Sequence, residues 1–194
     1  WGLNYRGMDN DFTMQLGPAA RYEGHGASSS ESGQITCADT GLETMTGGRI
    51  SRIRDYVRSE HFFATYGDGL SDLDIRDLYE FHLREGRIGT VTGVNPDSRF
   101  GVIESDGGRK VDRFREKPKL DSFVSGGFFV FRRDFFPFLD DHSVLEGAPL
   151  SNLASSGQLS LYKHQGFWKS MDTYRDFVEY NDMWKRGETP WKVW

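Results

Sequence analysis

A strand-length apolar run, a helical segment and a second strand-length run follow one another in the middle of this chain. HFFATYG, residues 61–67, is short and apolar, which is typical of a strand that is covered on both faces. SDLDIRDLYEFHLREG, residues 71–86, has helical apolar spacing, an expected N-cap at Ser71 or Asp72 and a stop at Gly86. GTVTGV, residues 89–94, is the next strand. This order predicts an α/β fold with a mostly parallel sheet.

The remaining pattern extends this prediction. RFGVIESDGGRKVDRFREKP, residues 99–118, predicts two strands joined by an Asp-Gly turn. An apolar strand from Ser125 runs into a helix near Asp134, and two further helices flank the strand QLSLYKHQ, residues 158–165. With 194 residues and 37% hydrophobic composition, the chain suits one globular domain.

Charge and cysteine content exclude several classes of function. The net charge is -5 and no basic run is present, which argues against nucleic-acid binding. Cys37 is the only cysteine, so neither an intrachain disulfide nor a cysteine zinc cluster can form, and a reducing compartment is expected. No apolar run has the length of a membrane span, so no membrane partner is predicted. The five histidines show no zinc-binding spacing.

Two carboxylates are candidate metal ligands because each follows a predicted strand. Asp68 lies between two glycines, which allow a bulky ligand to approach closely, and Mg²⁺ is a natural partner for such a carboxylate. The alternative is that GDG is only a turn. Asp172, in GFWKSMDTYRD, is either the N-cap of the last helix or a second metal ligand. Strand ends of an α/β sheet meet at one edge, so the two carboxylates have the placement that a shared magnesium site requires.

Three further segments have the chemistry of a phosphate or sugar site. In Glu116-Lys117-Pro118 the proline is expected to hold Lys117 extended, so that its ammonium meets a phosphate while Glu116 accepts from hydroxyls. The turn at Ser125, Gly126 and Gly127 offers a glycine-lined wall. Thr46-Gly47-Gly48-Arg49 opens a helix whose backbone N–H groups suit an anion. The alternatives are a solvated ion pair, packing at a sheet corner and an ordinary helix start.

Taken together, these segments resemble one family, the sugar-1-phosphate nucleotidyltransferases, and within it the cytidylyl branch that acts on glucose 1-phosphate. The matching words occur in order along nearly the whole chain: LNYRGMDNDFT, DTGLETMTGGRI, FFATYGDGLSDLDI, FREKPK, GGFFVF, GFWKSMDTYRD and PWKVW. The resemblance implies a Rossmann-like, mixed but mostly parallel sheet flanked by helices. It also implies that residues 1–194 form the central and C-terminal part of a single nucleotidyltransferase domain.

The resemblance assigns roles to residues of this chain. Asp68 and Asp172 correspond to the magnesium pair, with Asp68 and Lys117 as catalytic residues. The sugar phosphate would contact Glu116, Lys117, Ser125, Gly126 and Gly127, and the nucleotide would contact Thr46, Gly47, Gly48, Arg49, Tyr66 and Gly67. The implied reaction joins CTP and α-D-glucose 1-phosphate to give CDP-glucose and pyrophosphate with Mg²⁺. The implied setting is the bacterial cytoplasm and the supply of sugars for surface polysaccharide, in an enzyme that can be a homo-oligomer.

The sequence departs from this family in two ways. The glycine-rich GGxGTRL loop and the PKPM segment do not occur, so we expect the chain to start after the first strand of the fold and these 194 residues to be inactive alone. Ser125 stands where close relatives usually have asparagine, which puts one sugar contact in doubt. Two alternatives stay open: an enzyme that uses UTP or dTTP, and a truncated, non-catalytic binding or regulatory chain.

Overall fold

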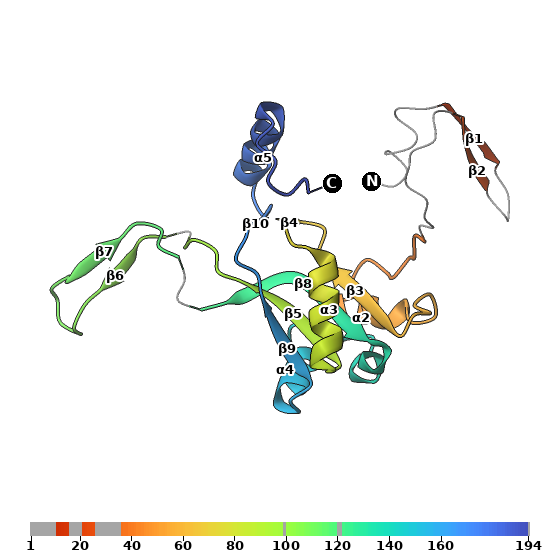
Figure 1. Ribbon diagram of the computed structural model, residues 1–194, viewed down its shortest axis with the longest axis horizontal. Helices are drawn as coiled ribbons and strands as arrows, with labels where there is room; N and C mark the ends of the chain where they lie inside the picture. Colours follow the sequence, from red (N-terminus) through yellow and green to blue (C-terminus); the bar gives the residue numbers. More distant parts are fainter. Residues whose placement is uncertain (1–10, 16–20, 26–35, 99, 120–121, 194) are drawn as a thin grey trace. The chain divides into compact units, whose positions relative to one another are not determined.

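The computed structural model describes residues 11–15, 21–25, 36–98, 100–119 and 122–193, and Figure 1 traces its helices and strands. The chain divides into two compact units, residues 1–39 and residues 40–194. In the first unit β1 (Asp11–Gln15) pairs antiparallel with β2 (Arg21–His25). The second unit contains every residue that the sequence predicts for the site.

The second unit is built on a mixed four-stranded sheet. Its strands lie in the order β3 (His61–Thr65), β8 (Val124–Arg132), β5 (Gly89–Val94) and β9 (Leu159–Lys163). β8 runs antiparallel to both β3 and β5, and only the pair β5–β9 is parallel. The expectation of a mostly parallel sheet is therefore wrong, because β8 enters between the two strands of the β3–α3–β5 crossover. Since β3, β5 and β9 still point the same way, their carboxyl ends share an edge with the start of β8.

The crossover helix α3 (Ile75–Glu85) is the amphipathic segment that the sequence predicts. Its N-cap is Asp74, whose carboxylate accepts from two backbone N–H groups of the first turn, and it ends at Gly86 with a left-handed φ of 65°. The predicted N-cap at Ser71 or Asp72 is wrong, because the short strand β4 (Gly69–Ser71) precedes the helix and pairs with β10 (Trp168–Ser170). The predicted stop at Gly86 is confirmed.

Successive side chains of β8 reach the two faces of the sheet, which each carry a core. Phe129 and Phe131 pack in one cluster with residues of the 3₁₀ helix η1 (Arg133–Phe138) and of α4 (Ala148–Ser155). Val130 packs in the other with Leu78 of α3, and Figure 1 shows α3 along these strands. β3 lies at the edge of the sheet and Phe63 is 49% exposed, so burial of this strand on both faces is wrong.

Four further elements complete the described chain. β6 (Val102–Glu104) and β7 (Arg113–Arg115) form the antiparallel hairpin that the sequence predicts. α2 (Thr46–Arg52) precedes β3, and α5 (Tyr174–Arg186) follows β10. Among the described residues no helix combines the length and the apolar character that crossing a membrane requires.

Candidate functional site

A pocket of about 220 Å³ opens at the edge where β3 ends and β8 begins. Its walls come from the end of β3, from the glycine segment of β8, from β10 and from the loop before α4. The lining residues are Tyr66, Asp68, Gly69, Ser125, Gly126, Gly127, Glu146, Trp168 and Ser170. Of the residues predicted from the sequence, the structure brings together Tyr66, Asp68, Ser125, Gly126 and Gly127 in this pocket, which we call the Asp68 pocket.

The β4–β10 ribbon places the two candidate metal ligands at one end of a short ladder. Ser170 lies opposite Gly69, and the next backbone contact is a hydrogen bond of 2.8 Å from the Met171 N–H to the Asp68 carbonyl. Asp68 and Asp172 therefore leave the ladder at the same end. The Ser170 hydroxyl lines the Asp68 pocket and donates to Oδ2 of Asp172 over 2.9 Å, which ties this carboxylate to a residue of the pocket wall, although Asp172 itself does not line the pocket.

Asp172 does not cap the helix that follows it. The N-cap of α5 is Thr173, whose hydroxyl accepts from the Asp176 N–H while the Asp176 carboxylate accepts from the Thr173 N–H, a complete capping box. The N-cap interpretation of Asp172 is therefore wrong. The Asp172 backbone N–H also donates to the Asp176 carboxylate, over 3.2 Å, which fixes the turn that presents the Asp172 side chain.

Tyr66 forms the wall of the pocket next to β8. Its hydroxyl donates to the carboxylate of Glu146, and burial first, then this hydrogen bond and the Glu146 charge, raise the pKa of Tyr66 above its ordinary value. Gly127 has a φ of 76°, and a Cβ there would lie 3.0 Å from the Tyr66 ring. Glycine is therefore required at this position both by the backbone and by the neighbouring ring.

Gly67 differs from the glycines of the wall. A Cβ at Gly67 would meet no atom within 4 Å, whereas a Cβ at Gly126 would lie 2.9 Å from Val94. The fold therefore requires glycine at position 126 for packing, but it does not require glycine at position 67. A ligand that binds next to Asp68 can therefore occupy the open space beside Gly67.

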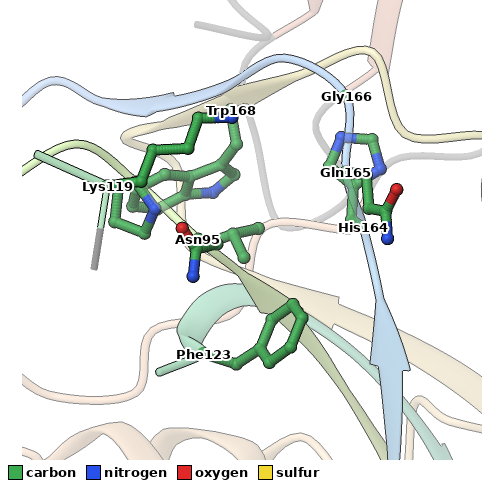
Figure 2. A pocket seen from close by; sticks show the side chains of 9 residues that line it. Asn95, Lys119, Phe123, His164, Gln165, Gly166 and Trp168 are labelled. Carbon is green, nitrogen blue, oxygen red and sulfur yellow. The ribbon is translucent and has the colours of Figure 1, made fainter. Parts of the chain in front are cut away.

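A second pocket, of about 320 Å³, adjoins the first and shares Trp168 with it. Figure 2 shows Asn95, Lys119 and Trp168 on one side of this pocket and His164 with Gln165 on the other. The indole Nε1 of Trp168 donates 2.8 Å to the Gly126 carbonyl, which fixes the ring between the two pockets. An aromatic face, two amides and one ammonium group are suited to a polar, hydroxylated ligand.

Glu116 and Lys117 follow β7, and neither lines the Asp68 pocket. The Lys117 Nζ lies 3.9 Å from Oε1 of Glu116. Lys117 has a φ of 43°, the only positive φ of a non-glycine residue in the described ranges. The expectation that Pro118 holds Lys117 extended is therefore wrong. Strained backbone of this kind is concentrated at functional sites. It therefore marks Lys117 as a candidate functional residue, but it does not place Lys117 at the Asp68 pocket.

The Thr46–Arg49 segment forms the first turn of α2, as predicted. Most of its polar groups form hydrogen bonds with other residues of the chain. The Gly48 N–H donates to the Ser143 carbonyl over 3.0 Å, and the Arg49 guanidinium donates to the Thr40 hydroxyl and the Leu42 carbonyl. Cβ atoms at Gly47 and Gly48 would lie 2.8 and 2.5 Å from the loop that begins at Asp141. None of these four residues lines the Asp68 pocket, but the Thr46 side chain hydrogen-bonds with Tyr66, which does.

The donor set at the Asp68 pocket is compatible with Mg²⁺. Within the ranges that the structure describes, no three His, Cys, Asp or Glu side chains gather as a metal-binding group. Asp68 lines the pocket and Asp172 is held by Ser170, which also lines it, so the two would supply two carboxylates and leave the other positions of a cation to ligand oxygens. That composition is typical of Mg²⁺ sites that bind substrate phosphates.

Sequence reasoning missed Glu146 and Trp168 as lining residues. Glu146 lies in the loop before α4, where no repeated pattern or motif marks it, and only the packing of this loop against Thr46 brings it to Tyr66. Trp168 could have been found from the sequence. It is an aromatic residue close before the turn at Asp172, where its side chain can line that turn.

Comparison with known proteins identifies one family. Residues 18–185 match the family model described as Nucleotidyl transferase. The chain is 41% identical over 166 residues to a probable glucose-1-phosphate cytidylyltransferase of Bacillus subtilis, covering 84% of this chain and 65% of the relative. It is 43% identical over 163 residues to a glucose-1-phosphate cytidylyltransferase of Salmonella typhi, covering 82% of this chain and 63% of the relative. The chain thus spans less than two thirds of the length of these relatives.

Solved structures resemble the fold at lower identity. HddC from Yersinia pseudotuberculosis superposes with a TM-score of 0.55 at 19% identity, covering 72% of this chain and 62% of that chain. A putative glucose-1-phosphate thymidylyltransferase from Bacillus anthracis gives a TM-score of 0.54 at 18% identity, covering 74% and 62%. Identity below a quarter shows the fold alone, and it confirms the predicted α/β class.

Proposed function

This chain belongs to the nucleotidyl transferase family, and we propose that the complete protein transfers the cytidylyl group of CTP to α-D-glucose 1-phosphate. The products are CDP-glucose and pyrophosphate. The names of the relatives that share 41% and 43% of their residues with this chain support the choice of substrates. One structural observation carries the proposal: the β4–β10 ladder leads Asp68 and Asp172 out of the same end, at a pocket lined by glycines.

The proposed reaction needs no general base. An oxygen of the sugar phosphate, which is ionised at neutral pH, forms a bond to the α-phosphorus of CTP. The bond from the α-phosphorus to the bridging oxygen breaks, and the pyrophosphate leaves with that electron pair. Positioning of the two reactants in line and neutralisation of their charges then supply the rate enhancement.

Asp68 and Asp172 are the residues that would hold Mg²⁺ in this proposal. When bound, Mg²⁺ withdraws charge from the phosphate oxygens and orients them. The chain contributes the geometry: backbone pairing fixes Asp68, and the Ser170 hydroxyl holds the Asp172 carboxylate. The open space beside Gly67 leaves a phosphate room to approach Asp68 closely.

The roles of the sugar and nucleotide contacts are part of the same proposal. We place the sugar phosphate against Ser125, Gly126 and Gly127, with Glu116 as an acceptor for hydroxyls and Lys117 as a phosphate contact. The nucleotide would lie toward the segment Thr46–Arg49 and the pair Tyr66 and Gly67. For Lys117 the proposal requires the end of the β6–β7 hairpin to approach the pocket when the sugar phosphate binds, since Lys117 does not line it otherwise.

The test is an assay of the complete protein with CTP, α-D-glucose 1-phosphate and Mg²⁺, measuring pyrophosphate release and CDP-glucose. We expect turnover that EDTA abolishes. A panel with UTP, dTTP, GTP and ATP identifies the base, and a preference for UTP or dTTP would overturn the cytidylyl assignment while keeping the family. No turnover with any nucleotide would favour the non-catalytic alternative.

The cellular setting follows from the substrates. Because CTP is an intracellular nucleotide, we place the reaction in the bacterial cytoplasm, where it would supply activated sugar for surface polysaccharide. Assembly into a homo-oligomer is also proposed, and size-exclusion chromatography with light scattering of the complete protein tests it.

A further inference from the structure

The end of the β4–β10 ribbon opposite to Asp68 is closed by a group of polar contacts. The Asp72 N–H donates to the Phe167 carbonyl over 3.2 Å, and the Ser71 hydroxyl donates to the same carbonyl over 2.9 Å. The Leu73 N–H in turn donates to the Ser71 hydroxyl over 3.1 Å. The ribbon therefore has a carboxylate end at Asp68 and an anchored end at Ser71, three residues apart.

His164 joins this anchored end to the four-stranded sheet. Its backbone N–H donates to the Gly93 carbonyl over 2.9 Å and so continues the parallel β5–β9 ladder by one residue. Its side chain reaches the ribbon: Nε2 lies 3.1 Å from the Phe167 carbonyl and 3.2 Å from the Ser71 hydroxyl. One residue is thus bonded through its backbone to the sheet and through its ring to the ribbon.

Asp72 fixes the tautomer and the direction of this ring. Its Oδ1 lies 2.9 Å from His164 Nε2, and the side chain of His164 is only 10% exposed. Because the Phe167 carbonyl and the Asp72 carboxylate can only accept, Nε2 must carry the proton. Oδ1 is itself buried and, within the described ranges, makes no hydrogen bond of regular geometry, so the 2.9 Å contact with His164 Nε2 is the ion-pair contact that the structure gives it. Such a buried carboxylate needs this partner.

Gly166 makes space for that carboxylate. A Cβ at position 166 would lie 2.3 Å from Oδ1 of Asp72 and 2.9 Å from its Cγ. The loop between β9 and β10 can therefore pass Asp72 only with glycine at this position. His164 and Gly166 also line the pocket of Figure 2, next to Trp168. The contact thus lies at the pocket that shares Trp168 with the Asp68 pocket.

We propose that His164, oriented by Asp72, is a positioning residue that holds the two strands of the β4–β10 ribbon together at their far end, through Ser71 and Phe167, and thereby sets the spacing of Asp68 and Asp172 at the other end. This inference rests on the proposed function for the identity of the two carboxylates as metal ligands. A shared cation requires its two ligands to be held within a fraction of an ångström. The ribbon is a separate two-stranded sheet, so its position depends on contacts such as this one.

The experiment compares His164→Leu with His164→Gln in the complete protein. Leucine removes the Nε2–H donor, whereas the glutamine amide can still donate to the Phe167 carbonyl and to Asp72. We expect His164→Leu to raise the Mg²⁺ concentration for half-maximal turnover about tenfold, in the range that loss of a metal-site supporting contact produces. His164→Gln should stay within about threefold of the unaltered protein. The same shifts should appear in Mn²⁺ binding measured by electron paramagnetic resonance with CTP present.

His82→Leu is the control, because His82 is a histidine on α3 that is buried more deeply than His164 and bonds with His61 and Thr90 rather than with the ribbon. It should lower thermal stability without moving the Mg²⁺ midpoint. An unchanged midpoint in His164→Leu, or an equal shift in His82→Leu, would overturn the proposal. Should His164→Leu not fold, Gly166→Ala displaces the Asp72 carboxylate instead, and an unchanged midpoint there would also overturn it.

The two proposals fail in different ways. Absence of turnover in the unaltered complete protein contradicts the proposed function, but it leaves the Mn²⁺ measurement in place. If Mn²⁺ then binds equally well to the unaltered protein and to His164→Leu, the positioning role is contradicted on its own. Weaker Mn²⁺ binding in His164→Leu, restored in His164→Gln, supports it whatever the nucleotide preference.

Discussion

The indole Nε1 of Trp168 donates a hydrogen bond of 2.8 Å to the carbonyl of Gly126, and this bond joins the β4–β10 ribbon to the glycine segment of β8. Both residues line the Asp68 pocket, so the bond joins two of the elements that form its walls. Trp168 also lines the neighbouring pocket of Figure 2. One ring therefore separates the two cavities and positions the wall that they share.

Replacing this ring with one that cannot donate should affect both stability and substrate binding. In Trp168→Phe the buried Gly126 carbonyl loses its partner, which costs about 1–3 kcal/mol of unfolding free energy. We expect the KM for glucose 1-phosphate to rise more than the KM for CTP. Urea unfolding and steady-state kinetics of the complete protein measure both. Trp184→Phe, at a position that is 57% exposed on α5, should change neither, and equal effects in the two variants would contradict the assignment.

Asp68→Asn should abolish magnesium-dependent turnover while leaving the fold intact. Asparagine keeps the size and the backbone pairing of Asp68 but removes the charge, and the loss of metal stabilisation corresponds to at least about a hundredfold in kcat. The matched control is Asp74→Asn, because asparagine caps a helix as well as aspartate and α3 should persist. Near-normal activity in Asp68→Asn would make YGDG a turn without a catalytic role.

The glycines at positions 48 and 67 should respond in opposite ways to alanine. A Cβ at Gly48 would lie 2.5 Å from the Asp141 carbonyl, so Gly48→Ala should destabilise the protein by about 1–3 kcal/mol despite the better helix propensity of alanine. A Cβ at Gly67 has open space, so Gly67→Ala should be nearly neutral in unfolding but should raise the KM for a substrate that occupies that space. A neutral Gly48→Ala would show that α2 does not pack closely on this loop.

Lys117→Gly should separate backbone strain from chemistry. A left-handed backbone costs a non-glycine residue roughly 1 kcal/mol, which is offset in part by the greater freedom of unfolded glycine. We therefore expect an unfolding free energy that is unchanged or slightly raised, together with loss of turnover. Lys117→Ala keeps the strain and should be no more stable than the unaltered protein. Full activity in both variants would remove Lys117 from the site.

The pH dependence of stability should reveal His82. Burial first, and then His61 and Arg132, lower the pKa of His82 to about 4. Because the unfolded chain binds a proton near pH 6.5 and the folded chain does not, stability should fall as the pH drops from about 6.5 to 4, by at most about 3 kcal/mol. Above pH 6.5 the contribution of His82 is constant.

Urea unfolding at several pH values checks this prediction by comparing the unaltered protein with His82→Gln. Glutamine does not titrate, so the difference between the two curves isolates the histidine from the carboxylates that titrate in the same range. We expect a flatter curve for His82→Gln between pH 4 and 6.5. Parallel curves would show that His82 takes up its proton in the folded state.

The sequence predicted local elements well because they depend on neighbouring residues. The α3 segment, the β6–β7 hairpin and the strand from Gly89 to Val94 were all found from apolar spacing and turn residues. The direction of β8 could not be found in this way. The residues SGGFFVF do not specify which strands β8 pairs with. Its insertion between β3 and β5 depends on tertiary packing.

The site was predictable to a similar degree. Asp68 and the glycines from Gly126 were found because each stands at a strand end, and the structure brings them together. Glu146 is brought to Tyr66 by a loop that carries no motif, so only the folded chain shows it. In the Thr46–Arg49 segment the glycines suited an anion, and the folded chain adds a second reason for them, because the loop at Asp141 packs closely against Gly47 and Gly48.

The position of β8 between β3 and β5 also determines when the sheet can form during synthesis. β3 is complete at Thr65, yet the strand that pairs with it begins only at Val124. While the intervening chain emerges from the ribosome, Phe62 and Phe63 have no sheet partner and stay open to chaperones and to other nascent chains. Slowing translation beyond Arg132 should therefore reduce misassembly, whereas a pause before Val124 should increase it.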